Sequence, residues 1–244
     1  MEIVVAVAHV PWIEERVENL AVIRERCAPM EVIVAEDALP PDNAGCWPTT
    51  KRAMQAGLAT GAEAVLVLHD DAIPCEVNFA PALARLRALL PEEVLGLFFM
   101  APSAARAAWE AGSSWLRAPG WVYGLANLYP AHLLAEFLVW VEQEIPEDYD
   151  VNVDDRRVGA WLTEIGRSAW YPVPNLVEHP EMRSSLGHTM RPGGRPRVSP
   201  DWMGAQDPMT FDWTLGLDDP PVHRAGTPPK FISGARRLRE ERSR

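Results

Sequence analysis

Three apolar runs of strand length, separated by segments with helical periodicity, constrain the fold of this sequence more than any other feature. The runs are EIVVAVAHV (2–10), MEVIVAEDA (30–38) and VLVLHDD (65–71), and the helical segments are 13–27 and 49–61. Continuous apolar runs are typical of strands that are covered on both faces. Thr49 and Thr50 are candidate N-caps of the second helix. This β-α-β-α-β order with short connections predicts a parallel sheet with right-handed crossovers.

The rest of the chain continues the alternation of strands and helices. Predicted helices cover 80–94, 131–145 and 156–166, and predicted strands cover 95–101, 120–130 and 168–179. A loop rich in Pro, Asn and Gly spans 39–48, an acidic loop spans 146–155, and 102–119 carries no clear pattern. We therefore expect an α/β fold, with a single Rossmann-like domain and a mostly parallel central sheet over residues 1–188.

The composition changes beyond residue 188. Pro and Gly recur at short intervals, so residues 189–244 are predicted to form an extended or partly disordered C-terminal arm. The arm holds ten Lys and Arg residues against seven Asp and Glu, a charge of +3, which leaves −14 for residues 1–188. The acidic body disfavours nucleic acid and anionic membranes as general partners, whereas the arm fits an anionic acceptor.

Composition also indicates a cytoplasmic protein. The longest apolar runs fall far short of the ~20 residues that cross a bilayer, and Met1 leads straight into a strand without a basic leader segment. Cys27, Cys46 and Cys75 form no CxxC pair and leave one cysteine over in any disulfide scheme, so reduced thiols are expected. No GxGxxG or Walker-type phosphate loop occurs, which disfavours dinucleotide oxidoreductases and P-loop enzymes.

Acidic residues follow two of the predicted strands directly. Asp37 follows the second strand, and His69, Asp70 and Asp71 end the third. Ligands of open parallel sheets bind beyond the carboxyl ends of the strands. Two carboxylates held close together repel each other unless a cation neutralises them or one pKa rises, and Mg²⁺ or Mn²⁺ with substrate phosphate oxygens suits such a pair. The alternative is turn chemistry, with one Asp capping the next helix.

The order of four segments resembles that of GT-A fold glycosyltransferases, family 2-like and of the inverting type. The segments are VIVAED, LATGAEAVLVLHDDAIPC, DVNVDDRRVGAWLTEIG and WYPVPNLVEHPEMRSSLGH. In this order they are similar to an acid that meets the nucleotide, a DxD-type motif, an ED-type acceptor motif and a last strand with a metal-binding histidine. The resemblance covers residues 2–188, and the sequence departs from the pattern at His69, which replaces the first acid of D-x-D.

The resemblance implies a metal-dependent transfer of a sugar from a nucleoside diphosphate sugar, with UDP as the commonest donor nucleotide of the fold. In that case Asp71 and His179 would hold Mn²⁺ or Mg²⁺, and Asp37 and Asp70 would contact the nucleotide. Asp155, or failing that Asp154, would be the general base on the face opposite the leaving group, which implies inversion. Helix capping is the alternative role for both of these acids, and a structural role is the alternative for His179.

Four further residues are candidate contacts to the nucleotide or the sugar. Trp47, Trp121 and Tyr123 offer aromatic rings, and the glycines on either side of 121–123 permit close approach of a ligand. Lys51 opens a helix near the same edge and can meet a phosphate. The alternatives are core packing for the tryptophans and simple solvent exposure for Lys51.

Two other classes of function stay open. A sugar nucleotidyltransferase shares the sheet and the acid-bound Mg²⁺, but such enzymes usually carry a Gly-rich basic loop after the first strand, where this chain has HVPWIEERVE. A non-catalytic nucleotide-binding module would use the same acids only as caps.

The acceptor is suggested only by the same kind of resemblance. HDDAIPC and NLVEHP resemble segments of glycosyltransferase-like proteins of bacteria and their tailed viruses. This adds a hydroxymethylated pyrimidine of viral DNA to glycans and small molecules as candidate acceptors, with the host cytoplasm as the location if the protein is viral. A target base in DNA would have to be turned out of the stack to reach a cleft. The sequence does not indicate an oligomeric state.

Overall fold

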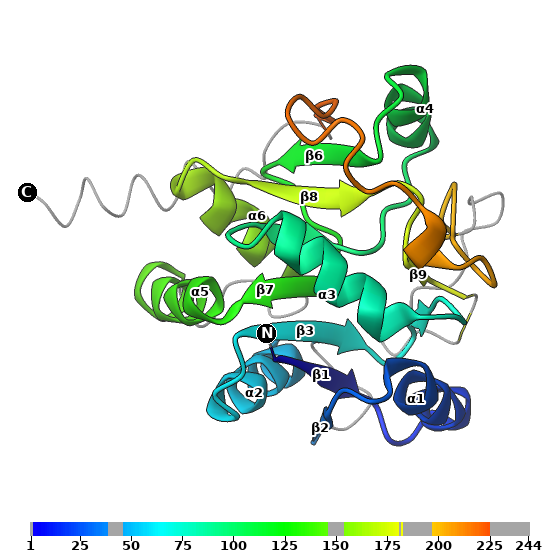
Figure 1. Ribbon diagram of the computed structural model, residues 1–244. Coiled ribbons are helices and arrows are strands. Elements are labelled where there is room, and N and C mark those ends of the chain that lie inside the picture. Colours follow the sequence, from blue (N-terminus) through cyan, green and yellow to red (C-terminus); the bar gives the residue numbers. More distant parts are fainter. Residues whose placement is uncertain (1, 39–45, 146–153, 181, 183–196, 225–244) are drawn as a thin grey trace, which may run out of the picture.

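A seven-stranded mixed sheet forms the centre of the computed structural model, which describes residues 2–38, 46–145, 154–180, 182 and 197–224 (Figure 1). The strands are β1 (Ile3–His9), β2 (Val32–Glu36), β3 (Ala64–His69), β5 (Val94–Gly96), β6 (Trp115–Pro119), β7 (Ala126–Pro130) and β8 (Ser168–Pro172). Their order across the sheet is β2-β1-β3-β7-β5-β8-β6. β6 and β7 run antiparallel to their neighbours, and the other five strands point the same way. The prediction of an α/β fold with a mostly parallel central sheet is confirmed.

The first three predicted strands and the helices between them form as expected. β1 pairs in parallel with both β2 and β3, and α1 (Glu14–Cys27) and α2 (Cys46–Ala59) lie on the connections. All seven residues of β1 are buried, which is why its sequence is apolar at every position instead of alternating.

The beginning of α2 differs from the prediction. Thr49 and Thr50 lie inside the first turn of the helix instead of capping it, because the described helix already begins at Cys46. The Thr50 hydroxyl donates a hydrogen bond to the Cys46 carbonyl at 2.9 Å, a bond that threonine commonly makes within a helix. Pro48 fits at this place because backbone N–H groups of the first turn have no partner within the helix. Residues 39–45 of the predicted loop lie outside the described residues.

Helices cover both faces of the sheet and give it two apolar layers. α2, α4 (Pro102–Glu110), α5 (Ala131–Glu144) and α6 (Asp154–Glu164) pack on one face, where Met54, Phe137 and Trp161 are buried. α1 and α3 (Phe79–Leu89) pack on the other face, which α3 crosses in Figure 1. Burying one large apolar side chain stabilises a fold by about 1.5–3 kcal/mol. Several of the buried polar residues, among them His9, Asp70 and Asp71, lie where β1 and β3 end.

The segment 102–119, which carries no clear pattern in the sequence, forms α4 and the edge strand β6. α4 is only nine residues long and buries only the small side chains of Ala104, Ala105 and Ala108, so its apolar face extends over few turns. Pro102 begins this helix and Gly112, with φ +62°, follows it. These two residues were the only local signals of the helix.

Three of the predicted strands are shorter in the structure. β5 ends at Gly96, β7 begins at Ala126 and β8 ends at Pro172, so all of 97–101, all of 120–125 and residues 173–176 lie outside the named strands. The GWVYG segment at 120–124 is a loop that begins with Gly120 at φ +67°. A Cβ atom on Gly159 of α6 would come within 2.7 Å of the Gly120 carbonyl oxygen. The loop is therefore packed closely against α6.

The C-terminal residues 197–224 pack against the body, whereas the sequence predicted an extended arm. Trp213 is fully buried, and its carbonyl accepts a hydrogen bond of 2.7 Å from the indole nitrogen of Trp115 in β6. The short 3₁₀ helix η2 (Pro208–Thr210) lies near α3, where Arg85 donates to the Met209 carbonyl at 3.0 Å. This part of the chain runs from β9 (Val177–Glu178) toward β6, as the orange trace of Figure 1 shows. The predicted boundary at residue 188 lies outside the described residues.

The helices in the described part of the chain do not span a membrane. None of them combines the length and the apolar character needed to cross a bilayer.

Candidate functional site

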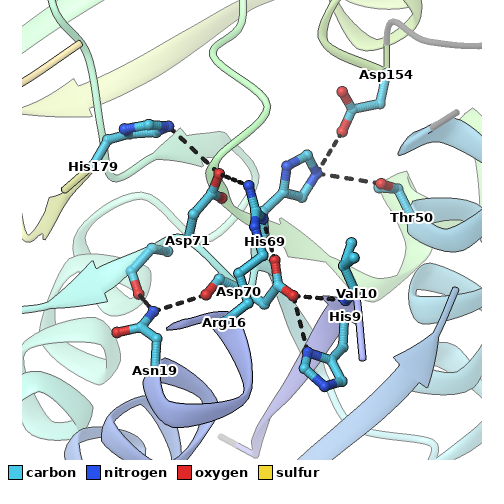
Figure 2. A network of polar contacts seen from close by, with 11 residues as sticks. His9, Val10, Arg16, Asn19, Thr50, His69, Asp70, Asp71, Asp154 and His179 are labelled. Carbon is cyan, nitrogen blue, oxygen red and sulfur yellow. Dashed lines mark hydrogen bonds and ion pairs between the residues drawn. The ribbon is translucent and has the colours of Figure 1, made fainter. Parts of the chain in front are cut away.

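The carboxyl ends of β1 and β3 lie side by side and carry the polar residues that the sequence singled out. Ala8 of β1 is the register partner of His69, so the HDD segment emerges next to His9 (Figure 2). A short two-stranded ribbon of β4 (Ile73–Pro74) and β9 then pairs Ile73 with Glu178 in antiparallel register. This pairing brings His179 beside Asp71, although they are more than one hundred residues apart in the sequence.

Asp70 is bound entirely by protein donors. Its Oδ2 accepts hydrogen bonds from the Val10 backbone at 2.6 Å and from His9 Nδ1 at 2.9 Å, and its Oδ1 is bound by Arg16 Nη1. The side chain is 1% exposed. Asn19 of α1 also donates to the Asp70 carbonyl at 2.8 Å and so fixes the turn. Both carboxylate oxygens of Asp70 are thus engaged inside the fold, and its contact with a nucleotide stays a prediction.

Arg16 is the cation that keeps the two adjacent carboxylates together. Its second terminal nitrogen, Nη2, lies 2.7 Å from Asp71 Oδ2, so one guanidinium group bridges Asp70 and Asp71. Burial alone would lower the pKa of Arg16, but the two carboxylates raise it above its ordinary value. The sequence analysis missed this residue, since Arg16 stands in an acidic helical segment, EERVEN, far from the acids in the sequence.

Asp71 and His179 each have one polar side-chain atom that the described protein residues do not bind. Asp71 Oδ2 lies 3.5 Å from His179 Nε2, whereas Asp71 Oδ1 and His179 Nδ1 are buried without a hydrogen-bond partner in the described structure. Burial would raise the pKa of Asp71, but the hydrogen bond with His179 and the charge of Arg16 hold it below its ordinary value. Asp71 is thus an ionised carboxylate with an unused oxygen.

Asp71 and His179 could supply two of the ligands of a divalent metal ion. Within the described ranges no group of three or more His, Cys, Asp and Glu residues is arranged to hold a metal ion. Asp71 and His179 offer two donors, one carboxylate oxygen and one imidazole nitrogen. Mg²⁺ commonly takes one or two protein carboxylates and completes its octahedron with water and substrate phosphate oxygens. The two residues can therefore hold Mg²⁺ or Mn²⁺ together with a phosphorylated ligand.

A second polar group lies on the other side of His69 (Figure 2). His69 Nε2 lies 3.0 Å from Asp154 Oδ2 and 3.2 Å from the Thr50 hydroxyl, so it links β3 to the first turns of α6 and α2. Burial lowers the pKa of His69, but the Asp154 carboxylate and the other nearby acids raise it to about 9. In turn, burial would raise the pKa of Asp154, and His69 holds it below its ordinary value. The pair is a partly buried imidazolium and carboxylate.

Asp154 is held in place from several sides. Its Oδ1 accepts hydrogen bonds from the Asp155 backbone at 3.0 Å and from the Cys46 thiol at 3.6 Å. A Cβ atom on Gly124 would lie 2.8 Å from the same oxygen, so only glycine leaves room for the carboxylate. Asp154 is therefore occupied by protein partners.

The Asp155 carboxylate, at the start of α6, can accept further hydrogen bonds. Its Oδ1 accepts one hydrogen bond of 2.7 Å, from the backbone of Arg156, and the residue is only partly buried. Burial and the neighbouring Asp154 carboxylate raise the pKa of Asp155 to about 6. A carboxylate with such a pKa can take up a proton close to neutral pH. The acidic loop before it, 146–153, lies outside the described residues.

Trp121 and Tyr123 lie in an aromatic row that leads to His179. The rings of Trp121 and Tyr123 are 6.0 Å apart, Tyr123 is 5.9 Å from Phe98, and Phe98 is 6.0 Å from the His179 ring. Both predicted residues are only partly buried. This row of rings connects the GWVYG loop to the residue that follows β9.

Trp47 and Lys51 have protein partners that favour their alternative roles. Trp47 is buried, with its ring edge-on to Phe137 at 5.9 Å and the Arg157 guanidinium 4.9 Å from its centre. Lys51 Nζ lies 2.9 Å from Glu142 on α5, and both side chains are substantially exposed. Trp47 thus lies in the core and Lys51 is partly exposed, and the contacts of both with the nucleotide or the sugar stay predictions. Asp37 is buried at the end of β2, and its backbone donates to the His9 carbonyl at 2.7 Å, so it does lie at the predicted edge.

Comparisons with known proteins give only distant likenesses. No protein-family model matches the sequence, and no curated protein matches it. Similar solved structures include A197 from STIV, with a TM-score of 0.44 and 11% identity over 76% of this chain and 87% of that one. They also include the mannosyltransferase PcManGT from Pyrobaculum calidifontis in complex with GDP-Man and Mn²⁺, with a TM-score of 0.39 and 18% identity over 69% of this chain and 53% of that one. A third is a glycosyltransferase involved in the glycosylation of the major capsid of PBCV-1, with a TM-score of 0.38 and 10% identity over 96% of this chain and 100% of that one. Because all three TM-scores are below 0.5, we argue function from the geometry of the site.

Proposed function

We propose that this protein is a GT-A type glycosyltransferase that moves a sugar from a nucleoside diphosphate sugar to an acceptor hydroxyl with inversion. The observation that carries the proposal is the meeting of Asp71 and His179 at the carboxyl edge of the sheet, with an unused carboxylate oxygen on Asp71. This edge is where open α/β sheets bind nucleotide ligands. Asp155, at the start of α6, supplies a second carboxylate of different character close to the same edge.

Asp71 and His179 would hold Mn²⁺ or Mg²⁺ against the diphosphate of the donor. When bound, the metal ion would act as a Lewis acid that neutralises negative charge on the departing diphosphate. Arg16 keeps Asp71 ionised and oriented through its bond to Oδ2, which leaves Oδ1 for the ligand. Asp37 lies at the end of the neighbouring strand, where we place the nucleoside, and UDP is our first choice of donor nucleotide.

Asp155 is our choice of general base over Asp154. Asp154 is engaged by His69, Cys46 and a backbone amide, so its lone pairs are largely used. Asp155 has a pKa raised to about 6 and can accept the proton of an attacking hydroxyl at neutral pH. A base on the face opposite the diphosphate gives inversion at the anomeric carbon. Asp154 then serves to hold His69.

The row of Trp121 and Tyr123 is our proposed contact for the sugar or the acceptor. Aromatic faces stack on apolar ring surfaces. These two rings are partly exposed, and Phe98 links Tyr123 to His179. The acceptors compatible with the proposal are a hydroxymethylated pyrimidine of viral DNA, a glycan and a small molecule. DNA as the acceptor predicts binding that weakens steeply with salt, since phosphate contacts release counterions.

A panel of nucleoside diphosphate sugars, each with and without Mn²⁺, tests the donor site. A ligand that binds only the native state raises the melting temperature, so the true donor should raise it only when Mn²⁺ is present. Asp71→Asn should abolish the shift, whereas Asp218→Asn, an exposed acid on the C-terminal segment, should leave it unchanged.

Turnover separates the proposal from its competitors. Slow Mn²⁺-dependent hydrolysis of the donor, lost in both Asp71→Asn and Asp155→Asn, supports the transferase. Formation of a nucleoside diphosphate sugar from a nucleoside triphosphate and a sugar phosphate would instead identify a nucleotidyltransferase. Ligand binding without any turnover would identify a non-catalytic module, and a protein that binds none of these ligands would refute the proposal.

A further inference from the structure

The chain returns to the site after residue 196, and the segment 197–204, here called the strap, lies against the ribbon that carries His179. We propose that the strap is a working part of the site and that Glu178 is a positioning residue, which fixes His179 through the strap. The inference rests on the proposed function only for the role of His179 as a metal ligand. The contacts of Glu178, Asn175 and the ribbon strands carry it.

Glu178 joins His179 to the strap through a single oxygen atom. Its Oε1 accepts a hydrogen bond from the His179 backbone at 2.7 Å and another from the Ser199 backbone at 2.8 Å. Both donors are backbone N–H groups, so the bonds fix the path of the chain instead of a side-chain rotamer. The backbone direction at His179, and with it the direction of the imidazole toward Asp71, thus depends on the strap.

Asn175, four residues before His179 in the sequence, also binds the strap. Asn175 is fully buried, and its Nδ2 donates to the Ser199 hydroxyl at 2.6 Å and to the Phe99 carbonyl at 2.8 Å. Its backbone N–H donates to the Asp201 carbonyl at 2.8 Å, and its own carbonyl accepts from the Met203 backbone at 3.0 Å. The strap is therefore paired like an extra strand beside the chain that leads into β9.

The ribbon needs this support because it is very short. β4 and β9 contain two residues each, and an isolated two-stranded pair is marginally stable at best. The strap contacts both sides of it, since Glu76, which follows β4, donates from its backbone to the Gly204 carbonyl at 2.9 Å. Asp71 precedes one strand of the ribbon and His179 follows the other. The distance of 3.5 Å between Asp71 Oδ2 and His179 Nε2 thus depends on a ribbon that the strap stabilises.

Two substitutions of Glu178 test the inference on the full chain. Glu178→Ala removes the acceptor of both backbone bonds, whereas Glu178→Gln keeps an acceptor oxygen in the same place. Glu76→Ala is the matched control, because the Glu76 side chain is 48% exposed on the same ribbon and pairs only with Arg26 among the described contacts. Two quantities are measured: the affinity for Mn²⁺ in the presence of a nucleoside diphosphate, by titration calorimetry, and hydrogen exchange in peptides covering 173–180 and 197–204.

We expect Glu178→Ala to weaken Mn²⁺ binding about tenfold, the lower end of the loss seen when a residue that orients a metal ligand is removed. Hydrogen exchange should accelerate in both peptides together, and Glu178→Gln and Glu76→Ala should resemble the wild type in both measurements. If Glu178→Ala changes neither quantity, or if Glu178→Gln fails as badly as Glu178→Ala, the inference is wrong.

The two proposals can fail separately. If the wild type binds no Mn²⁺ but Glu178→Ala still accelerates exchange in both peptides, the metal role of His179 falls while the link between the strap and His179 stands. If Mn²⁺ binding is intact and exchange in 173–180 does not respond, the transferase stands and the strap is only an appendage.

Discussion

Arg16 decides how two adjacent carboxylates can sit at the end of a buried strand. Its guanidinium contacts both Asp70 and Asp71, and all three side chains are at most 13% exposed. An Arg fork matches carboxylate geometry better than a lysine ammonium does, because it presents several donors in one plane. The charge of Arg16 thereby offsets the repulsion between the two carboxylates inside the fold, before any ligand arrives.

Arg16→Ala should destabilise the protein by about 3–5 kcal/mol, because it leaves the buried Asp70 charge without its main partner. Urea unfolding at neutral pH measures the change. The control is Arg24→Ala, an exposed arginine on the same helix, which should change stability by less than about 0.5 kcal/mol. A loss for Arg16→Ala no larger than that of the control would show that the bridge contributes nothing.

The raised pKa of Asp155 predicts a pH dependence with opposite signs for activity and stability. As a general base Asp155 must be ionised, so kcat/KM should fall about tenfold per pH unit below about 6. Folding favours the protonated form, so its contribution to stability is full below the unfolded pKa and is lost as pH rises through about 6. At pH 8, Asp155→Asn should therefore be inactive yet up to about 2 kcal/mol more stable than the wild type.

A pH–rate profile and urea unfolding at pH 5 and pH 8 check both signs. Glu164→Gln, on the exposed end of the same helix, is the control and should change neither measurement. An inactive Asp155→Asn variant that is also less stable at pH 8 would argue for a structural role instead.

At the scale of elements, the site is a junction between helix starts and strand ends. His69 at the end of β3 contacts Thr50 in the first turn of α2 and Asp154 in the first turn of α6. The GWVYG loop closes against this junction, with Gly124 directly beside the Asp154 carboxylate. β3, α2 and α6 thus meet around the side chain of His69, and the glycine at position 124 leaves room for Asp154 there.

Gly124→Ala should displace Asp154 and weaken its pair with His69, because the added Cβ would lie 2.8 Å from Oδ1. We expect a loss of about 1–3 kcal/mol in stability, as is typical of overpacking, and a fall in turnover. A double-mutant cycle with Asp154→Ala checks the cause, since removing the carboxylate should relieve most of the clash. Fully additive effects of the two substitutions would locate the damage elsewhere.

At the scale of the molecule, the described C-terminal segment belongs to the same cooperative unit as the sheet. Trp213 is fully buried against Trp115, with ring centres 6.2 Å apart, and it shares hydrogen bonds with β6 and η2. Two isolated bridges, Arg117 with Val222 and Asn175 with Trp202, join the segment to the body at points far apart along it. We expect this segment to unfold together with the sheet.

Trp213→Ala should cost about 3–5 kcal/mol, as expected for removing a buried large aromatic side chain. Leu215→Ala is the control, because Leu215 is 48% exposed and lies two residues away. Unfolding followed by both tryptophan fluorescence and far-UV circular dichroism should give one shared transition in each variant. A separate early transition for the C-terminal segment would contradict a single cooperative unit.

The sequence alone determined the alternation of strands and helices in the first half and the position of acids at strand ends. This was possible because burial on both faces imposes an apolar run on each strand, and the run ends where the chain meets solvent. It left α4 without a signal, since this helix has only nine residues and buries only alanines. It also predicted strands over 95–101, 120–130 and 168–179 that are longer than the strands of the structure.

The tertiary structure decided which of the candidate residues form the site. The bridge from Arg16, the pairing of β4 with β9 that brings His179 to Asp71, and the link between His69 and Asp154 all join segments more than fifty residues apart. The same holds for the C-terminal segment. Its Pro- and Gly-rich composition predicts an extended arm, whereas Trp213 is buried in the core. Such contacts depend on which surfaces meet after folding, and no local pattern in the chain specifies that.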